Sequence, residues 1–471
     1  MILRDYQLRC LSDLRASWRQ RPILYLPTGG GKTAVACAII QGAIANGKRV
    51  IFCAHRRGLI FQARDRLRAF GIEAGIVMGD HHRTEGPVQV ASIQTLCRRD
   101  VPADIIIVDE CHHATSATWK GVVARYPIVV GLTATPYRLD GAPLGDVFGT
   151  IVHGPSVSEL IADGVLINPR IFAPPGPDLK GVHSRGGDYV PSELENAVNK
   201  PQLLGDVVTH WKKHADGLRT VAFGVGIAHS MAIARAFGEL GYHIDGSSPQ
   251  SEREDAVARL ESGEIKVLSN CDLIGEGWDL PSLDCAILAR PTQSMALHRQ
   301  QIGRVMRACP GKTGALILDH AGNTHRHGLP TDEISVSLEG EAKRKQEAAP
   351  RTCKKCFAVT DSYPCWCCGY EPEEVVREIA TKDGDLSEIP PDSPEQRRQW
   401  YAAQVAMVSD MGWKLGAAKY RYKQRYSVWP RFREEDAKYV CPGHVFETRT
   451  YGTVCARCLR SPEKATAAAI V

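Results

Sequence analysis

Long apolar runs are missing from this chain of 471 residues. No window holds about 18 consecutive apolar residues, the length that a bilayer-spanning helix needs, so we expect no membrane span. The first residues, MILRDYQLRC, also lack a basic region followed by an apolar core, so we expect no secretory signal. These absences predict a cytoplasmic protein with reduced thiols.

A large excess of charge of either sign is missing too. The net charge is only +5, which permits nucleic-acid binding through local patches but does not require it. The length predicts two or three domains, and a hydrophobic content of 44% is ordinary for a soluble globular protein. Because thiols stay reduced in the cytoplasm, we expect the 16 cysteines to be buried thiols or metal ligands rather than disulfides.

Two series of alternating strands and helices are predicted. In each series, short apolar runs alternate with helical stretches, which is typical of a parallel sheet covered on both faces. A Pro/Gly-rich break at residues 172–187 lies between them. The first series has strands at 22–27, 49–55, 87–93, 104–110 and 127–135, and helices at 32–46 and 59–70. The second has strands at 219–225, 242–246, 265–270, 285–290 and 315–320.

The pattern divides the chain into three regions, at residues 1–167, 168–330 and 331–471. The third opens with a charged linker, TDEISVSLEGEAKRKQEAAP, and holds eight of the 16 cysteines. Its acidic, apolar-poor run EPEEVVREIATKDGDLSEIPPDSPEQ is predicted to be a mobile linker. The fold class that we expect is therefore α/β, with two tandem parallel-sheet lobes followed by a small cysteine-rich tail.

A glycine-rich turn follows the first predicted strand, in PILYLPTGGGKTAVACAII. Its backbone N–H groups can converge on phosphate oxygens, and the helix that begins near Lys32 adds its positive end. Lys32 is predicted to neutralise the β- and γ-phosphates, and Thr33 to ligate magnesium. Leu26 stands where the usual G-x-x-x-x-G-K-T pattern has its first glycine, and a flexible turn with a chance lysine is the alternative. The further nucleotide contacts that we expect are Thr28, Gly29, Gly30 and Gly31.

A phosphate-binding turn needs a partner strand that ends in acidic residues, and IIIVDECHHA supplies it. Asp109 is predicted to hold magnesium and Glu110 to polarise the attacking water. Cys111 and His112 are adjacent in sequence, a poor arrangement for a tetrahedral zinc shell, which normally uses spaced pairs. We interpret Cys111 as a packing residue and His112 as a contact that relays nucleotide state. An ordinary buried polar group is the alternative for His112.

Eight short motifs in order resemble those of superfamily 2 helicases of the DECH-box kind, over roughly residues 1–328. Together with LDHAGNTHRHG and the cysteine-rich tail, they most resemble RadD-like and phage-encoded helicases. The eight motifs are LRDYQ, LPTGGGKT, AHRRGLI, ASIQTL, DECH, GLTATP, LSNCDLIGEGWDLP and QQIGRVMR.

The resemblance implies two RecA-like lobes with ATP and magnesium bound between them. It places Gln7 on the adenine base and Asp279 at the ribose. Closure of the lobes would bring Arg304 and Arg307 of the second region onto the γ-phosphate, and Gln300 would orient the water. The alternative for this last stretch is a basic surface helix.

Contacts with a nucleic-acid backbone are expected at the turns between strands and helices. Such contacts carry little sequence information because they read phosphates rather than bases. An ordinary solvated charge is the alternative for the first of them. The predicted contacts are Arg56, Arg57, Ser92, Thr95, Ser269 and Asn270.

Paired cysteines in the tail have the spacing of structural zinc sites. One set reads C-x2-C-x8-C-x2-C, with Cys367 left over, and the other reads C-x2-H-x10-C-x2-C. Free thiols, an iron–sulfur cluster and ligands mixed between the two sets are the alternatives. The predicted zinc ligands are Cys353, Cys356, Cys365 and Cys368 in the first set, and Cys441, His444, Cys455 and Cys458 in the second.

Between the two sets lies GWKLGAAKYRYKQRYSVWPRFR. From Lys414 to Arg433 it holds seven basic residues and no acidic residue. Basic groups grip phosphates and aromatic faces stack on bases, so this segment is a candidate nucleic-acid contact. A small helical core with a solvated basic face is the alternative. Its aromatic residues are Trp413, Tyr420, Tyr422, Tyr426 and Trp429.

These expectations converge on a nucleic-acid-dependent ATPase, a helicase or translocase acting on single-stranded or branched DNA. The QQIGR form, in place of the HRIGR form typical of DEAD-box RNA helicases, favours DNA over RNA. The alternatives are an ATP-switched DNA-binding remodeller that does not unwind duplex, and an RNA helicase. A metabolite kinase is disfavoured because it has no use for a second lobe with paired arginines. Repair, replication-fork processing and a phage function remain open, and the sequence identifies no protein partner.

Overall fold

The computed structural model divides into two compact units, Met1–Glu374 and Val375–Val471. In the described part of the chain, no helix is long and apolar enough to cross a lipid bilayer. Five residues that the sequence analysis assigned to sites lie outside the described residues: Arg56, Asp279, Cys441, His444 and Cys458. The described residues are 2–55, 57–79, 86–137, 142–273, 280, 282–339, 342–344, 350–372, 393–426, 428–430, 446–449 and 452–455.

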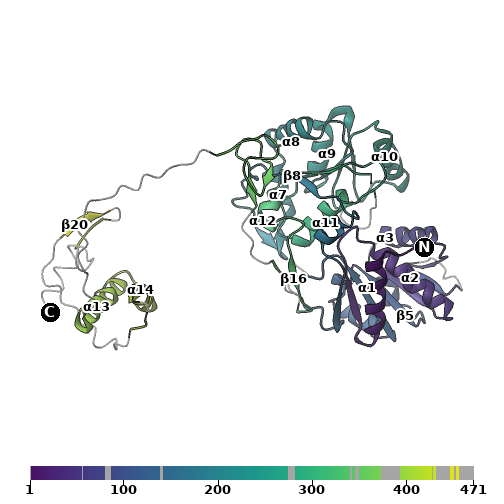
Figure 1. The fold of residues 1–471 in the computed structure, drawn as a ribbon, viewed down its shortest axis with the longest axis horizontal. Coiled ribbons are helices and arrows are strands. Elements are labelled where there is room, and N and C mark those ends of the chain that lie inside the picture. Colours follow the sequence, from purple (N-terminus) through teal and green to yellow (C-terminus); the bar gives the residue numbers. More distant parts are fainter. Residues whose placement is uncertain are drawn as a thin grey trace. The chain divides into compact units, whose positions relative to one another are not determined.

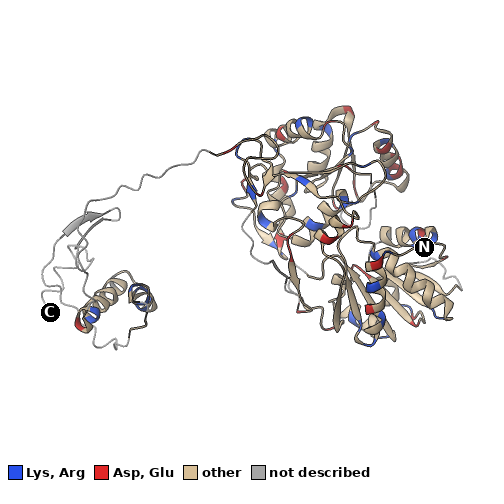
Figure 2. Ribbon diagram, viewed as in Figure 1, with Lys and Arg blue, Asp and Glu red and all other residues tan. Residues whose placement is uncertain are grey.

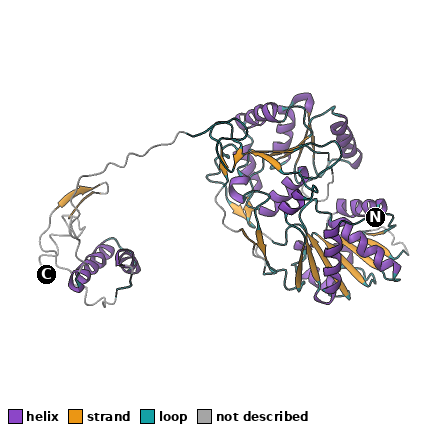
Figure 3. Cartoon of the chain, viewed as in Figure 1, coloured by secondary structure: helices purple, strands orange, loops and turns teal. Residues whose placement is uncertain are grey.

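The first lobe is a seven-stranded parallel sheet, in the order β3-β4-β2-β5-β6-β1-β7. Figure 1 and Figure 3 show the strands of this lobe with helices packed around them. Separate apolar clusters cover its two faces, and the central strands are continuous buried runs, as a sheet covered on both sides requires. The strands are β1 Pro22–Tyr25, β2 Val50–Ala54, β3 Gly75–Val77, β4 Val88–Ser92, β5 Ile105–Asp109, β6 Ile128–Thr133 and β7 Thr150–His153. The helices are α1 Asp5–Ala16, α2 Lys32–Ala45, α3 Arg57–Ala69, α4 Ile93–Leu96, α5 Ala117–Val123 and α6 Val157–Ala162.

The second lobe repeats this plan with six parallel strands, in the order β12-β13-β11-β14-β15-β8. Its presence confirms the predicted α/β class with two parallel-sheet lobes. The strands are β8 Pro169–Phe172, β11 Thr220–Phe223, β12 Gly241–Ile244, β13 Val267–Asn270, β14 Cys285–Leu288 and β15 Ala315–Asp319. The helices are α7 Pro191–Val198, α8 Pro201–His214, α9 Ile227–Ala236, α10 Gln250–Ser262, α11 Met295–Val305 and α12 Asn323–His327.

Three strands of the two large sheets, β3, β7 and β8, were not predicted, and all three lie at sheet edges. An edge strand pairs with one neighbour and is not fully covered, so its sequence need not be a long apolar run. β7 shows this directly, because only one of its four residues is buried. The pattern of buried hydrophobicity therefore found the interior strands and missed these edges.

The prediction of a charged linker after the second lobe is wrong for the first part of that segment. Residues 331–339, which we call the return segment, run back to the first lobe and include β16, Ile334–Val336. This strand pairs antiparallel with β17, Ala342–Arg344. Between Ile334 and Leu338 the apolar residues alternate with serines, a period of two that suits a strand, and the acidic residues stand outside this stretch.

Hydrogen bonds to its main-chain oxygens fasten the return segment to both lobes. Leu338 O accepts the N–H groups of Leu144 and Gly145 in the first lobe, at 2.7 and 2.9 Å. Arg299 of α11 donates to Asp332 O at 2.7 Å. Leu338 also packs its side chain against the core of the first lobe. The two lobes are therefore joined at a second place besides the chain that follows α6.

The first cysteine set packs on the second lobe. Residues 350–372, the cysteine module, contain the short strands β18, Arg351–Thr352, and β19, Val359–Thr360. Ala173 N donates to Phe357 O at 2.9 Å, just beyond β8. The cysteines share an apolar cluster with residues of the lobe such as Trp211. This set therefore belongs to the first compact unit and extends the second lobe.

The second unit contains a pair of packed helices and a hairpin. The helices are α13, Pro394–Asp410, and α14, Gly416–Tyr426, and the hairpin strands are β20, Phe446–Arg449, and β21, Gly452–Cys455. A small core joins the helices, as the alternative reading of the basic-aromatic segment expected. Its buried members are Tyr401, Met407, Val408, Ala418 and Tyr422.

Tyr422→Ala should destabilise the helix pair, because removing a buried aromatic ring costs about 3–5 kcal/mol and this core is small. Tyr422 is 4% exposed and its ring lies edge-on to Tyr401. The matched control is Tyr420→Ala, since Tyr420 is 58% exposed on the same helix and should change stability by less than about 0.5 kcal/mol. Amide hydrogen exchange in α13 and α14 measures both. Equal protection in the two variants would contradict the assignment of the core.

Candidate nucleotide site between the two lobes

The phosphate-binding turn joins β1 to α2. Gly29 and Gly31 have φ values of 87° and 88°, in the left-handed region that favours glycine. Leu26 is fully buried beneath the turn, and its Cγ lies 2.8 Å from the place that a Cβ on Gly30 would take. Leu26 therefore anchors the turn to the core at the position where the usual motif has a glycine.

A cavity of about 360 Å³ lies beside this turn and is walled by both lobes. Lys32 and Thr33 enter it from the start of α2, and Asp109 and Glu110 from the end of β5. Lys32 Nζ donates to Leu26 O at 3.2 Å. The lining residues are Arg4, Thr28, Gly29, Gly31, Lys32, Thr33, Ala34, Leu59, Arg66, Phe70, Asp109, Glu110, Val165, Gln300, Arg304, Arg307 and Ala308.

The charge of the cavity wall is mainly positive, with five basic side chains and two carboxylates. Burial raises the pKa of Asp109 and lowers the pKa of Lys32, against the attraction between these opposite charges. Each charged form therefore gains from a further partner of opposite sign. A phosphate is such a partner for Lys32, and a divalent cation for Asp109. Thr33 and Asp109 offer hard oxygen donors at one wall, which fits magnesium.

Glu110 begins a short series of polar contacts that ends at β6. Its φ of 46° turns the backbone out of β5. Its Oε2 lies 3.4 Å from His112 Nδ1, and that nitrogen lies 3.0 Å from Thr133 Oγ1. Thr133 Oγ1 also accepts the N–H of Thr135 at 3.0 Å, and a hydroxyl oxygen can accept a second hydrogen bond, so an Nδ1–H of His112 can face both this oxygen and the Glu110 carboxylate. His112 thus links the DECH stretch to the TAT stretch, the geometry that its predicted relay role requires.

Cys111 points into the core of the first lobe. Its Sγ lies 2.8 Å from the place that a Cβ on Gly131 would take, and Phe148 lies equally close to that place. Burial raises the pKa of the Cys111 thiol. These contacts confirm the interpretation of Cys111 as a packing residue.

The second lobe closes the cavity with α11 and with Arg307, which lies two residues beyond the end of this helix. The structure brings Gln300, Arg304 and Arg307 to the cavity wall, as predicted. The positive charges of Arg307 and Arg304 lie close enough to Lys32 to contribute to its lowered pKa. Arg307 forms a β-bridge with Leu166, in the chain that connects the lobes.

A glycine of each lobe meets a side chain of the other lobe at this point. A Cβ on Gly29 would lie 3.1 Å from Arg307 Cγ, and Gly303 is so close to Thr28 that a Cβ would lie 2.7 Å from the Thr28 Cβ. Arg66 of α3 also lines the cavity, although the sequence analysis did not assign it. Burial and the charge of Arg66 lower the pKa of Arg307 to about 10. The guanidinium groups are thus crowded, and an anion placed between them would relieve their repulsion.

The start of α1 supports the turn from behind. Tyr6 donates its hydroxyl to Gly30 O at 2.8 Å, and Gln7 Nε2 lies directly against Gly31. Gln7 Oε1 accepts the N–H of Arg4 at 3.0 Å. Gln7 is therefore held beside the turn, and Arg4, which was not predicted, reaches the cavity itself. Arg4, Tyr6 and Gln7 all belong to the LRDYQ motif, from which the sequence analysis assigned a role only to Gln7.

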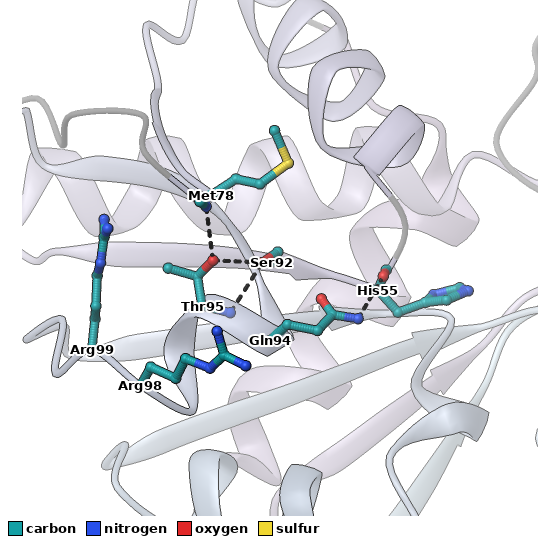
Figure 4. Close-up of a pocket in the computed structure, with 8 residues that line it drawn as sticks. His55, Met78, Ser92, Gln94, Thr95, Arg98 and Arg99 are labelled. Carbon is teal, nitrogen blue, oxygen red and sulfur yellow. Dashed lines mark hydrogen bonds between the residues drawn. The ribbon is translucent and has the colours of Figure 1, made fainter.

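A second cavity, of about 530 Å³, lies in the first lobe near the ends of β2, β3 and β4 (Figure 4). Ser92 Oγ accepts the N–H of Thr95 at 3.1 Å, and Gly79 N donates to Thr95 Oγ1 at 3.1 Å. The predicted Ser92 and Thr95 therefore line this cavity while they hold the start of α4. Arg98 and Arg99, which the sequence analysis did not assign, add two cations to the same wall (Figure 4).

The corresponding expectation for the second lobe is wrong. Ser269 and Asn270 are 0% and 1% exposed. Ser269 Oγ is hydrogen-bonded to Ser230 Oγ at 2.7 Å, and Asn270 donates to Ala222 O at 2.9 Å. Both side chains serve the packing of the sheet, so neither can reach the backbone of a bound strand. Arg57 opens α3, and Arg56 lies outside the described residues.

The four sulfur atoms of the cysteine module lie within 4.8 Å of one another. Cys353 Sγ is 3.6 Å from Cys368 Sγ, and Cys356 Sγ is 3.7 Å from Cys365 Sγ. Zinc–sulfur bonds of about 2.3 Å in a tetrahedron place the sulfurs about 3.8 Å apart, so the arrangement fits a structural zinc ion. Of the second set, Cys455 ends β21, and the other three residues lie outside the described residues.

Two protein-family models match the chain. The model described as "Type III restriction enzyme, res subunit" matches residues 1–138, and the model described as "Helicase conserved C-terminal domain" matches residues 200–309. The first match contains Lys32, Asp109 and Glu110, and the second contains α11 and Arg307. Neither match reaches the cysteine module or the second unit.

Individual proteins extend the similarity. The chain is 32% identical over 358 residues to the 51.5 kDa protein of Lactococcus phage (isolate 7-9), covering 73% of this chain and 77% of that protein. It is 30% identical over 356 residues to the putative ATP-dependent helicase IRC3 of Saccharomyces cerevisiae, covering 68% of this chain but only 52% of the yeast protein. A fragment of a putative HsdR subunit of a type I restriction enzyme from Vibrio vulnificus YJ016 shares the fold, with a TM-score of 0.54 at 22% identity over 73% of this chain and 70% of that chain.

Gly303→Ala should slow ATP hydrolysis while nucleotide affinity stays within a few-fold. The added methyl group would meet Thr28 across the lobes, and overpacking of this kind costs about 1–3 kcal/mol, or roughly 5- to 150-fold in rate if only the closed form is affected. The matched control is Gly205→Ala, also within a helix, where a Cβ meets nothing within 4 Å. Steady-state turnover and nucleotide titration measure both. Normal turnover in Gly303→Ala would contradict the closed contact.

Glu110→Gln should keep nucleotide binding and lose hydrolysis by roughly 10²- to 10⁴-fold, the usual contribution of a general base. The amide has the shape of the carboxylate but cannot accept the proton of water. Glu73→Gln is the control, because the Glu73 side chain is 78% exposed in the same lobe. Single-turnover hydrolysis alongside equilibrium binding separates the two effects. Near-normal hydrolysis would remove Glu110 from the catalytic role.

Proposed function

This chain belongs to the superfamily 2 helicases, which are ATP-hydrolysing enzymes, and we propose that it is a DNA helicase or translocase driven by ATP bound between its lobes. One observation carries the proposal: Asp109 and Glu110 of the first lobe line a single cavity with Arg304 and Arg307 of the second. A nucleotide site built from two lobes is complete only when they are closed. Hydrolysis can therefore drive movement of one lobe against the other.

The first lobe supplies most of the chemistry in this proposal. Lys32 and the N–H groups of the turn hold the phosphates, and Gln7 is proposed to contact the adenine base. Thr33 and Asp109 would hold a magnesium ion, which neutralises charge that develops on the phosphate oxygens. Glu110 takes the proton from the attacking water.

The second lobe completes the site on closure. Gln300 orients the attacking water, and Arg304 and Arg307 stabilise the charge of the transition state. His112 transmits the state of Glu110 to β6 through Thr133. Asp279 at the ribose belongs to the same proposal.

We propose single-stranded or branched DNA as the substrate, with RNA as the alternative. The strand would cross the first lobe at the second cavity, where Arg98 and Arg99 can pair with phosphates and the turns after β2 and β4 meet. An ATP-switched remodeller that binds DNA without unwinding it is the competing function. DNA-stimulated hydrolysis without displacement of a strand from a forked duplex would favour the remodeller.

A structural zinc ion held by the four cysteines of the cysteine module is part of the proposal, and an iron–sulfur cluster is its chemical competitor. The sulfur spacing supports four-thiolate coordination with no open position for catalysis. A second zinc site, the cytoplasmic location, a role in DNA repair, the DECH-box subtype and the region boundaries at 167/168 and 330/331 stay predictions.

Arg307→Ala should leave nucleotide affinity within a few-fold but slow hydrolysis by roughly 10³-fold or more, the range for loss of a transition-state arginine. Stimulation by single-stranded DNA should disappear with it, because DNA is expected to act by favouring closure. Lys32→Ala should instead weaken binding itself, since it removes a ground-state phosphate contact. Arg235→Ala, on the exposed side of α9, is the matched control. Nucleotide titration measures the affinities, and turnover with and without DNA measures the rate of hydrolysis and its stimulation. DNA-stimulated turnover in Arg307→Ala would overturn the assignment of Arg307.

Cys353→Ser with Cys356→Ser should lose one zinc ion per chain and make the cysteine module sensitive to protease, because structural zinc supplies folding energy directly. Cys367→Ser is the matched control, since this exposed thiol lies outside the four-sulfur group and should leave the metal content unchanged. Elemental analysis of the purified full chain measures zinc and iron together. Iron in place of zinc, or metal retained after the double change, would contradict the zinc assignment.

A further inference from the structure

The second unit displays large aromatic side chains that its own core does not cover. The core between α13 and α14 contains Tyr401 and Tyr422. Outside it, Trp413 is 53% exposed, Tyr420 58% and Trp429 54%. All three lie on α14 or within three residues of its ends, and exposed large apolar surface of this kind marks a binding site more often than chance exposure does.

Each exposed tryptophan has a cation over its ring. The guanidinium carbon of Arg421 lies 5.8 Å from the ring centroid of Trp413, and Lys423 Nζ lies 4.6 Å from that of Trp429. The α14 helix carries no acidic residue at all (Figure 2). A ligand that suits this surface is therefore anionic and also offers flat faces to the rings.

The spacing along α14 separates the packed face from the displayed face. Ala418 and Tyr422 are buried, whereas Tyr420, Lys423 and Gln424 are exposed. The last three occur at positions i, i+3 and i+4, so they share one side of the helix. Trp429, beyond the end of the helix, reaches the same side through its contact with Lys423. Trp413 lies at the border of this side, against Arg421, which is next to Tyr420 in the helix. One side of α14 thus builds the core, and the other displays aromatic rings and cations.

We propose that Trp413, Tyr420, Lys423 and Trp429, the aromatic–basic surface, bind single-stranded nucleic acid. The rings would stack on bases, and Lys423 with its basic neighbours would pair with phosphates. A single strand is required because the bases of a duplex are stacked on one another and offer no free face. Both family matches end before this unit, so the surface is additional to the strand path over the lobes. Binding there needs no ATP, and the inference therefore stands apart from the proposed hydrolysis cycle.

The test is fluorescence anisotropy of labelled oligothymidine with the full chain in the absence of nucleotide. Trp413→Ala, Tyr420→Ala and Trp429→Ala together should raise the Kd by about tenfold or more, since loss of one stacked base corresponds to roughly 5- to 150-fold. Lys423→Ala alone should weaken binding and lower the slope of log Kd against log salt by about one. Arg398→Ala removes an exposed charge of α13 and is the matched control, with the Kd expected within about twofold of the parent.

Three outcomes would overturn the proposal. They are an unchanged Kd for the triple variant, an equal loss of affinity for blunt duplex DNA, and an equal loss in Arg398→Ala. Hydrogen exchange in α13 and α14 confirms that the triple variant keeps its fold. Turnover at saturating DNA should be normal in the triple variant, while half-maximal stimulation should need more DNA. Because the binding arm contains no ATP, failure of the proposed hydrolysis mechanism would leave its result unchanged.

Discussion

The close approach of α11 to the phosphate-binding turn is the contact on which the rest of the site depends. Glycine at 29 and 303 lets the main chain of each lobe approach a carbon of the other that lies close to the backbone, Arg307 Cγ and Thr28 Cβ. Contacts between such stiff parts are made fully or not at all, unlike contacts between the ends of long side chains. The arginines, the acids at the end of β5 and the lysine of α2 are therefore brought together in a single step.

The sequence contained enough information for the interior of both sheets and for the main residues of the cavity. Continuous apolar runs located β1 and β5 because strands covered on both faces have no other composition available to them. Lys32 and Asp109 were found because each ends or follows such a strand, and Arg307 was found because its motif resembles one of the helicase motifs. Leu26 broke the motif without harm, since the position needs an anchor beneath the turn and a buried leucine provides it.

The sequence could not show whether a polar side chain at the end of a strand faces a cavity or the core of the sheet. Ser92 and Ser269 both lie at the carboxyl end of a parallel strand, yet one lines a cavity and the other is hydrogen-bonded in the core. Arg66 resembled any other charge of an amphipathic helix, because its place in the cavity depends on how α3 packs. The cysteine module likewise had recognisable spacing, but its attachment to β8 rests on contacts between residues far apart in the chain.

The return segment has a mechanical consequence. The lobes are linked covalently by residues 163–168, and residues 331–339 fasten them again on a different part of the first lobe through Leu144 and Gly145. A body attached to another at two separated points keeps one main freedom, which is rotation about the line through those points. The helicase lobes should therefore open and close by rotation about this one axis rather than by sliding or twisting past each other. Each turnover would then repeat the same rotation.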